Sequence, residues 1–126
     1  MKVLNVIETA YRATLEEQDD PVVWIIHAMK GAGADHSVLL QGNAVNYTVM
    51  AQGVPPLTFG DRAQKHAPRI AEQVASLVAK GVEVMVVREC LAERGIEQDE
   101  LMAGLTMVRA GAIPKVMGGY DQVWHW

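Results

Sequence analysis

The residues best suited to chemistry in this chain lie together at positions 88 to 94. Cys90 is the only cysteine, and arginines stand on either side of it, at Arg88 and Arg94. A cysteine attacks another sulfur atom as the thiolate, and nearby guanidinium groups stabilise that anion, whereas the carboxylate of Glu89 would oppose it. The pattern is typical of a nucleophilic thiol. The alternative for Cys90 is a small buried hydrophobic side chain.

Polar side chains elsewhere could line the same site if the fold brings them to it. Thr9 and Tyr11 follow the first apolar run of the chain and Asn43 follows the second, although turn formation and helix capping are alternative roles for them. His66 lies in a long polar loop that begins at Gly53, and loops of that length are more often functional than idle. We therefore predict substrate-binding roles for Thr9, Tyr11, Asn43 and His66.

The other three histidines are weaker candidates. His27 lies among apolar residues of an expected helix, and we interpret it as a packing residue. His36 begins an expected strand at its amino end, so we expect it at the surface, and His125 lies between two tryptophans, which suggests an interface or a sheet edge. None of them is spaced from another histidine or from Cys90 as metal ligands are, so no metal site is expected.

A valine-rich run, Val82 to Arg88, leads directly into Glu89 and Cys90 and predicts a buried strand. In an open parallel sheet, reactive groups collect at the carboxyl ends of the strands, and Cys90 would lie at such an end. Similar patterns predict four further strands, at residues 2–8, 36–41, 105–109 and 122–126. For the first of these, a helix running on to residues 14–17 is an alternative.

Helical spacing and capping residues separate these strands. Asp20 before Pro21 is typical of a helix start, because the aspartate caps free N–H groups and proline lacks one. Pro68 is expected in the first turn of the helix after the long loop. The helices are predicted at residues 21–30, 42–52, 67–78, 91–96, 97–103 and 112–117. The alternation predicts a single domain (residues 1–126) with a three-layer, flavodoxin-like α/β fold, an open, mainly parallel sheet of about five strands with helices on both faces.

Composition excludes several classes of function. A net charge of −4 leaves no basic stripe for phosphates, so no nucleic-acid partner is expected. The acidic N-terminal residues do not resemble a signal peptide, and the apolar run Val22 to Ile26 is far too short to span a membrane. A single cysteine fits a reducing compartment, and the glycine pairs lack the spacing of phosphate loops. We therefore expect a cytoplasmic protein with no cofactor and no membrane contact.

Three stretches resemble the DsrE/DsrF-like family of small sulfur-relay proteins, and they are residues 40–45, 81–96 and 118–123. The centre of the family pattern is a Gly-Val-Glu-Val strand, then a cysteine, then a short helix ending in Arg-Gly-Ile. Gly81–Val84 and Arg94–Ile96 match that centre. The usual cysteine would fall at Val87, three residues before Cys90. Three residues are close to one helical turn, so Cys90 could present its sulfur near the same spot.

The resemblance implies a role in sulfur relay, in which Cys90 accepts sulfur as a persulfide and passes it to a partner protein. Arg88 and Arg94 would assist Cys90, and the protein would be a sulfurtransferase or a sulfur carrier. The implied partners are a sulfur donor protein and a sulfur acceptor protein, and the implied assembly is a homo-oligomer, a trimer or a hexamer. The alternative is a non-catalytic oligomeric binding or regulatory protein on the same fold, with Cys90 structural.

Overall fold

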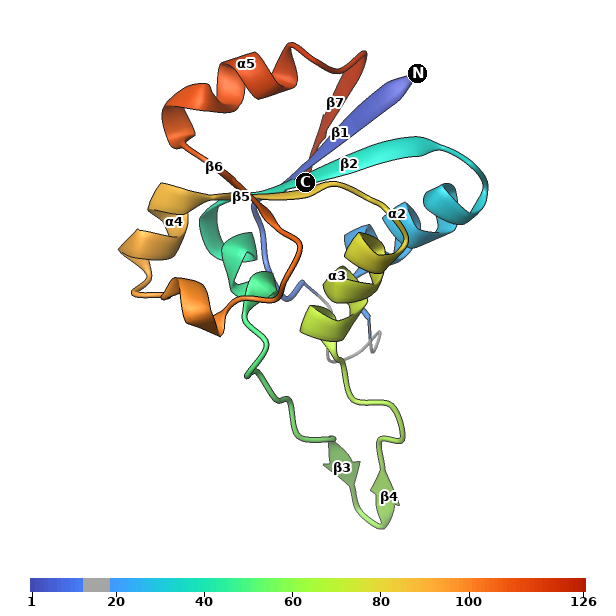
Figure 1. Ribbon diagram of the computed structural model, residues 1–126. Helices are drawn as coiled ribbons and strands as arrows, with labels where there is room; N and C mark the ends of the chain where they lie inside the picture. The colour runs from blue at the N-terminus through green and yellow to red at the C-terminus, as the bar shows by residue number, and fades with distance from the viewer. Residues whose placement is uncertain (13–18) are drawn as a thin grey trace.

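The computed structural model describes residues 1–12 and 19–126 (Figure 1). Its centre is a parallel sheet of five strands in the order β6-β5-β2-β1-β7. The strands are β1 (Lys2–Ile7), β2 (Asp35–Leu40), β5 (Val84–Val87), β6 (Thr106–Val108) and β7 (Gln122–His125). The predicted strands are confirmed, with ends that shift by a residue or two. The alternative helix reaching residues 14–17 falls outside the described residues.

Helices cover both faces of the sheet, with α2 and α3 on one side and α5 on the other (Figure 1). The α-helices are α2 (Pro21–Gly31), α3 (Ile70–Ala79), α4 (Arg88–Glu93) and α5 (Ile113–Met117). Short 3-10 helices are η1 (Gly42–Thr48), η2 (Gln98–Glu100) and η3 (Ala110–Ala112). Parallel neighbours need crossover connections, and these helices supply them. The predicted three-layer α/β fold is confirmed.

An apolar core lies on each face of the sheet. Successive side chains of a strand point to opposite faces, so Ile7, Val38 and Val86 pack with α2, α3 and η1. Their neighbours Val6 and Leu39 pack on the other face, with residues of α5. The central strands are therefore covered on both sides, which explains why β5 and the second half of β2 are continuously apolar instead of alternating.

Helix α2 begins where the Asp20-Pro21 pair predicts. One carboxylate oxygen of Asp20 accepts hydrogen bonds from the backbone N–H groups of Val22 and Val23, each at 2.9 Å. Pro21 occupies the first helical position, where no N–H donor is needed. The second carboxylate oxygen of Asp20 accepts a hydrogen bond from the hydroxyl of Tyr47, and both residues are buried. Asp20 therefore joins the start of α2 to η1.

The helix predicted over residues 42–52 is wrong in length, because it is the 3-10 helix η1 and ends at Thr48. Polar side chains compete for its carbonyl groups. The hydroxyl of Thr48 donates to the backbone O of Val45 at 2.6 Å, and the side-chain amide of Gln52 donates to the backbone O of Val49 at 2.7 Å. Side chains of this kind offer the backbone an alternative to a continued helix.

Other boundaries after the long loop also differ from the prediction. Pro68 precedes α3 instead of lying in its first turn, because Arg69 has a φ of −128°, outside the helical range. The helix predicted over residues 97–103 is only the single turn η2. The predicted long loop contains a small hairpin, formed by β3 (Thr58–Phe59) and β4 (Arg62–Ala63). Figure 1 shows this hairpin projecting away from the helices and the sheet.

The expectation that His36 lies at the surface is wrong, because its side chain is buried. Its Nδ1 accepts a hydrogen bond from the side-chain amide of Asn5 at 2.9 Å, so the ring is neutral and carries its proton on Nε2. The same amide donates to the backbone O of Ser37 at 3.2 Å, and the ring of Trp124 packs edge-on against the imidazole. At this end of β2 the cover comes from β1 and β7, through Asn5 and Trp124, because β5 pairs with β2 only from Val38 onward.

We expect the burial of His36 to make folding sensitive to acid. Burial lowers the pKa of His36 from its ordinary value of 6.5, because the charged ring loses water, and Asp35 partly opposes this. The unfolded chain then binds a proton at higher pH than the folded chain. The free energy of unfolding should therefore be highest above about pH 6.5, the pKa of His36 in the unfolded chain. It should decrease as the pH falls below that value toward the pKa of His36 in the folded chain.

Urea unfolding at about pH 7.5, 6.5 and 5.5 measures this dependence. His36→Gln cannot be protonated, so its stability should change less over that range than that of the wild type. Equal slopes for the two proteins would show that His36 is not the group responsible.

Candidate functional site

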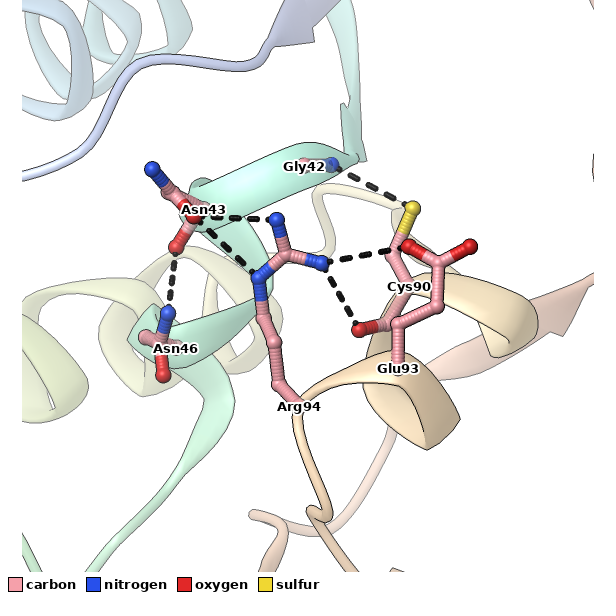
Figure 2. A network of polar contacts seen from close by, with 6 residues as sticks. All are labelled: Gly42, Asn43, Asn46, Cys90, Glu93 and Arg94. Atoms are coloured by element: carbon pink, nitrogen blue, oxygen red, sulfur yellow. Dashed lines mark hydrogen bonds and ion pairs between the residues drawn. The ribbon is translucent and has the colours of Figure 1, made fainter.

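Cys90 lies in the first turn of α4, which begins directly after β5. Val87, the place of the cysteine in the usual family pattern, is the last residue of β5 and is buried. Cys90 is only partly buried, and its Sγ accepts a hydrogen bond from the backbone N of Gly42 at 3.3 Å (Figure 2). Gly42 is the first residue of η1, just after β2. The sulfur therefore lies at the carboxyl ends of two neighbouring strands.

The close approach at Gly42 requires a glycine. Its φ is 55°, in the left-handed region that side chains with a Cβ rarely adopt. A Cβ at this position would lie 3.1 Å from Cγ of Glu8 and 3.4 Å from the backbone O of Glu8. This turn directs the amide of Gly42 at the sulfur. A hydrogen bond from a backbone N–H is stronger when the acceptor is an anion, so this contact suits a thiolate or a persulfide anion.

Arg94 ties α4 to η1 beside the sulfur (Figure 2). Its Nη1 donates to the backbone O of Cys90 at 3.0 Å, and its Nε and Nη2 donate to Oδ1 of Asn43 at 3.2 Å and 2.9 Å. Nη1 also lies 3.6 Å from the carboxylate of Glu93, and the backbone O of Asn43 accepts from the side-chain amide of Asn46 at 2.8 Å. The planar fork of donors therefore sets the spacing between Cys90 and Asn43.

Arg88 and Glu89 face away from this network. Arg88 is exposed and lines an open pocket beside α4. Cys90 lies roughly 200° further round the helix, so the pocket and the sulfur are on opposite sides of α4. Oε2 of Glu89 accepts a hydrogen bond from the backbone N of Ala110 at 2.7 Å. This bond is the main cause that lowers the pKa of Glu89, and it turns the carboxylate toward η3.

Thr9 and Tyr11 follow β1 but make their contacts elsewhere. The hydroxyl of Thr9 accepts a hydrogen bond from the guanidinium of Arg12 at 3.2 Å. The backbone N of Tyr11 donates to the hydroxyl of Tyr47 at 2.6 Å, and the hydroxyl of Tyr11 donates to Oε1 of Gln52 at 2.7 Å. Tyr11 is thus directed to the residues at the far end of η1. A substrate-binding role for either residue stays a prediction.

His66 lies at a different opening, a cleft of about 1210 Å³ between the long loop and helices α2 and α3. His27 borders the same cleft, and its ring has two partners. Its Nε2 donates to the backbone O of Gln73 at 2.8 Å, and its Nδ1 accepts from Nζ of Lys80 at 3.0 Å. Of the residues predicted from the sequence, the structure therefore brings together Cys90, Arg94 and Asn43, and it places His66 apart from them.

A polar pair at the same edge of the sheet was not predicted from the sequence. Nε2 of His125, at the end of β7, lies 2.8 Å from Oε2 of Glu8, which follows β1. Glu8 in turn flanks Gly42, whose amide contacts the sulfur. The two residues are 117 positions apart in the chain, and only the parallel pairing of β1 with β7 brings them together. No local sequence pattern signals this contact.

Within residues 1–12 and 19–126, no three side chains of His, Cys, Asp or Glu gather closely enough to hold a metal ion. None of the helices in those ranges has the length and apolar character needed to cross a membrane. Among the described residues, this edge of the sheet brings together a cysteine sulfur, a backbone amide that contacts it and an arginine that contacts its backbone.

Comparison with known proteins agrees with this architecture. The model of the DsrE/DsrF-like family matches residues 3–124. The ychN protein of E. coli has a TM-score of 0.72 and 17% identity, with 100% of both chains covered. MTH1491 of Methanobacterium thermoautotrophicum, a protein of unknown function, has a TM-score of 0.65 and 12% identity, and 98% of this chain and 97% of that chain are covered.

BT1422 of Bacteroides thetaiotaomicron, also of unknown function, has a TM-score of 0.64 and 13% identity, with 99% of this chain and 95% of that chain covered. A comparison with curated protein sequences gives no match. At these identities the solved structures establish a shared fold. The family match extends over nearly the whole sequence, and the chain belongs to the DsrE/DsrF-like family.

Proposed function

We propose that this protein takes part in sulfur relay, in which Cys90 accepts a sulfur atom as a persulfide and passes it to a partner protein. Family membership supports sulfur chemistry in general. The observation that carries the specific proposal is the hydrogen bond from the backbone N of Gly42 to the Cys90 sulfur at the carboxyl edge of the sheet. Intact mass measured after incubation with a persulfide donor tests it.

Each half of the proposed relay exchanges one S–S bond for another. The thiolate of Cys90 attacks the outer sulfur of the donor persulfide, the S–S bond of the donor breaks, and the donor cysteine leaves as a thiolate. Cys90 then carries the sulfur as a persulfide. In the second half, a thiolate of the acceptor attacks that outer sulfur and Cys90 leaves as a thiolate. Sulfur moves without net oxidation, so the relay requires no cofactor.

The protein's own residues have defined roles in this proposal. The amide of Gly42 stabilises the negative sulfur before the first attack and after the second. Arg94 acts as a positioning residue, because it holds the backbone of Cys90 against η1 through Asn43. Arg88 contributes only its charge from the other side of α4, where solvent screens it. The proposed transfer steps do not involve Thr9, Tyr11 or His66.

We expect Arg94→Met to slow sulfur uptake about tenfold, because the spacing between α4 and η1 would no longer be fixed. The final amount of adduct should stay the same, since Cys90 is unchanged. Arg88→Met is the matched control, because it removes an equal charge from the start of α4 but breaks no contact with Asn43 or Cys90. It should slow uptake less. A time course of intact mass measures both rates, and equal rates for the two variants would contradict a positioning role for Arg94.

Within the same proposal, the protein works in the cytoplasm as a homo-oligomer of three or six copies and meets separate donor and acceptor proteins. Large exposed apolar side chains support assembly, because a monomer rarely leaves many of them uncovered. Among the described residues they include Trp24, Phe59, Met107, Val123 and Trp126.

A second candidate function rests on the packing of Cys90. Its side chain contacts residues of both apolar cores, as a structural cysteine does. In this alternative the protein is a non-catalytic oligomeric binding or regulatory protein on the same fold. The two candidates differ in one property, because only the relay protein takes up sulfur on Cys90 in its native state.

A further inference from the structure

The β3–β4 hairpin presents an aromatic side chain on a projecting arm. Phe59 is the only phenylalanine of the chain and is 74% exposed. Gly60, with a φ of 63°, takes the first central position of the two-residue turn, as hairpin turns of this type require. Phe59 pairs with Arg62, and paired residues of antiparallel strands point to the same face. The tip therefore carries a ring and a guanidinium side by side.

The rest of the protein contributes little to the stability of this hairpin. Both strands have two residues, all of them exposed, and the hairpin extends well beyond α3 (Figure 1). A two-stranded hairpin is marginally stable by itself in water. Two hydrogen bonds between Gln64 and Leu57 hold the base of the hairpin together. The side-chain Oε1 of Gln64 accepts from the backbone N of Leu57, and the backbone N of Gln64 donates to the backbone O of Leu57. An ordered arm with an exposed aromatic tip is typical of an interaction surface.

A pocket with matching character lies beside α4. Its volume is about 550 Å³, and its apolar walls include Leu91, Ile96, Leu101 and Met107. Every lining residue comes from positions 88–107, so the pocket is built without the chain's own hairpin. Met107 belongs to β6, which is an edge strand of the sheet. Arg88 also lines the pocket, and an arginine side chain can stack on an aromatic ring.

The charges of the two surfaces are complementary. The hairpin and the residues just after it carry the cations Arg62 and Lys65 against the single anion Asp61, which leaves this segment with a net positive charge. The segment 97–100, Glu-Gln-Asp-Glu, begins in the wall of the pocket and is exposed throughout. The wall of the pocket and the turn beside it therefore carry three carboxylates, Glu97, Asp99 and Glu100. Such complementarity favours one orientation and speeds association.

We propose that the β3–β4 hairpin of one copy docks into the α4 pocket of a second copy, with the Phe59 ring between the apolar walls. Arm and pocket are different surfaces of one chain, so the contact is head-to-tail, and a ring is the closed assembly that it can form. The proposal rests on the homo-oligomer proposed above but not on the reactivity of Cys90. Docking covers α4 on the side opposite Cys90 and leaves the Gly42 side open to donor and acceptor.

Light scattering after gel filtration, over a range of protein concentrations, tests the assembly. Phe59→Ala should raise the dissociation constant about tenfold or more, because a buried aromatic anchor dominates such interfaces. Ala92→Arg, an exposed position in the pocket wall, should do the same by filling the pocket. Ile25→Ala, at an exposed apolar residue of α2 outside both surfaces, is the matched control. A wild type that stays monomeric, or variants with unchanged assembly, would overturn the proposal.

Cross-linking locates the contact independently of any loss of stability. All chains carry Cys90→Ser, and a Phe59→Cys chain is mixed with a Met107→Cys chain. Oxidation should link the two different chains, and it should do so faster than with Ala79→Cys, an exposed position on α3, in place of Met107→Cys. Equal rates would overturn the proposed contact. Sulfur uptake is measured separately on wild type, so failure of the relay and failure of this docking are distinguishable.

Discussion

Cys90→Ser should take up no sulfur, whereas the wild type should gain about 32 Da, the mass of one sulfur atom, when it is incubated with a persulfide donor. Serine keeps nearly the same size, so it should preserve the fold around Gly42. Its hydroxyl is not ionised at neutral pH and cannot hold a sulfur atom as a persulfide. Because Cys90 is the only cysteine, the expected loss is complete. Intact mass spectrometry under non-reducing conditions measures it.

Two controls make this result specific. Circular dichroism and urea unfolding should show the same fold and nearly the same stability for Cys90→Ser and wild type. Addition of excess small thiol should remove the added mass from the wild type, because its thiolate takes the outer sulfur and Cys90 leaves as a thiolate. A second molecule of the thiol then attacks the small persulfide, forms a disulfide and releases the sulfur as sulfide. A mass gain that persists in Cys90→Ser, or that survives the thiol, would contradict the assignment of Cys90.

Asp20→Ala should lower the free energy of unfolding by about 3 kcal/mol, a large share of the stability of an ordinary domain. Asp20 caps two N–H groups of α2, and it is the acceptor for the buried hydroxyl of Tyr47. Burial and this hydrogen bond raise the pKa of Tyr47, so the hydroxyl keeps its proton and needs an acceptor. Alanine removes the cap and leaves that proton unsatisfied in the core.

Related substitutions separate the two contributions of Asp20. Tyr47→Phe removes only the buried hydroxyl contact and should cost about 1 kcal/mol, and Asp20→Asn retains a capping oxygen and should cost less than Asp20→Ala. Asp35→Ala, which makes the same change at an exposed position, is the matched control. Urea midpoints at about pH 7.5 measure all four variants. If Asp20→Ala unfolds at the same urea concentration as Asp35→Ala, the stabilising role assigned to Asp20 is contradicted.

The elements with local signals could be predicted from the sequence, and those that depend on long-range packing could not. Short apolar runs between turn residues were enough to find the five strands of the central sheet, and the Asp20-Pro21 pair located the start of α2. The order of the strands was not predictable in this way, because β1 pairs with the last strand of the chain. His36 was misplaced for the same reason, since its burial comes from contacts with Asn5 of β1 and Trp124 of β7, which are distant from it in the sequence.

The candidate site was predictable to the level of the strand end but not to the level of side-chain direction. The sequence predicts a strand through Arg88 and a helix from Leu91, whereas β5 ends at Val87 and α4 begins at Arg88. Because α4 starts three residues earlier, Arg88 and Cys90 lie on opposite sides of it. Arg94 falls on the side of Cys90 and reaches Asn43, a contact between two segments that are distant in the sequence.

The measurement that tests the central claim most directly is the location of the added sulfur. The native wild-type protein is incubated with a persulfide donor, blocked with iodoacetamide without unfolding, and digested for peptide mass spectrometry. We predict an alkylated persulfide on the peptide that contains Cys90. If Cys90 is recovered as an unmodified thiol that reacts only after unfolding in urea, it is a structural cysteine, and the sulfur-relay function is contradicted.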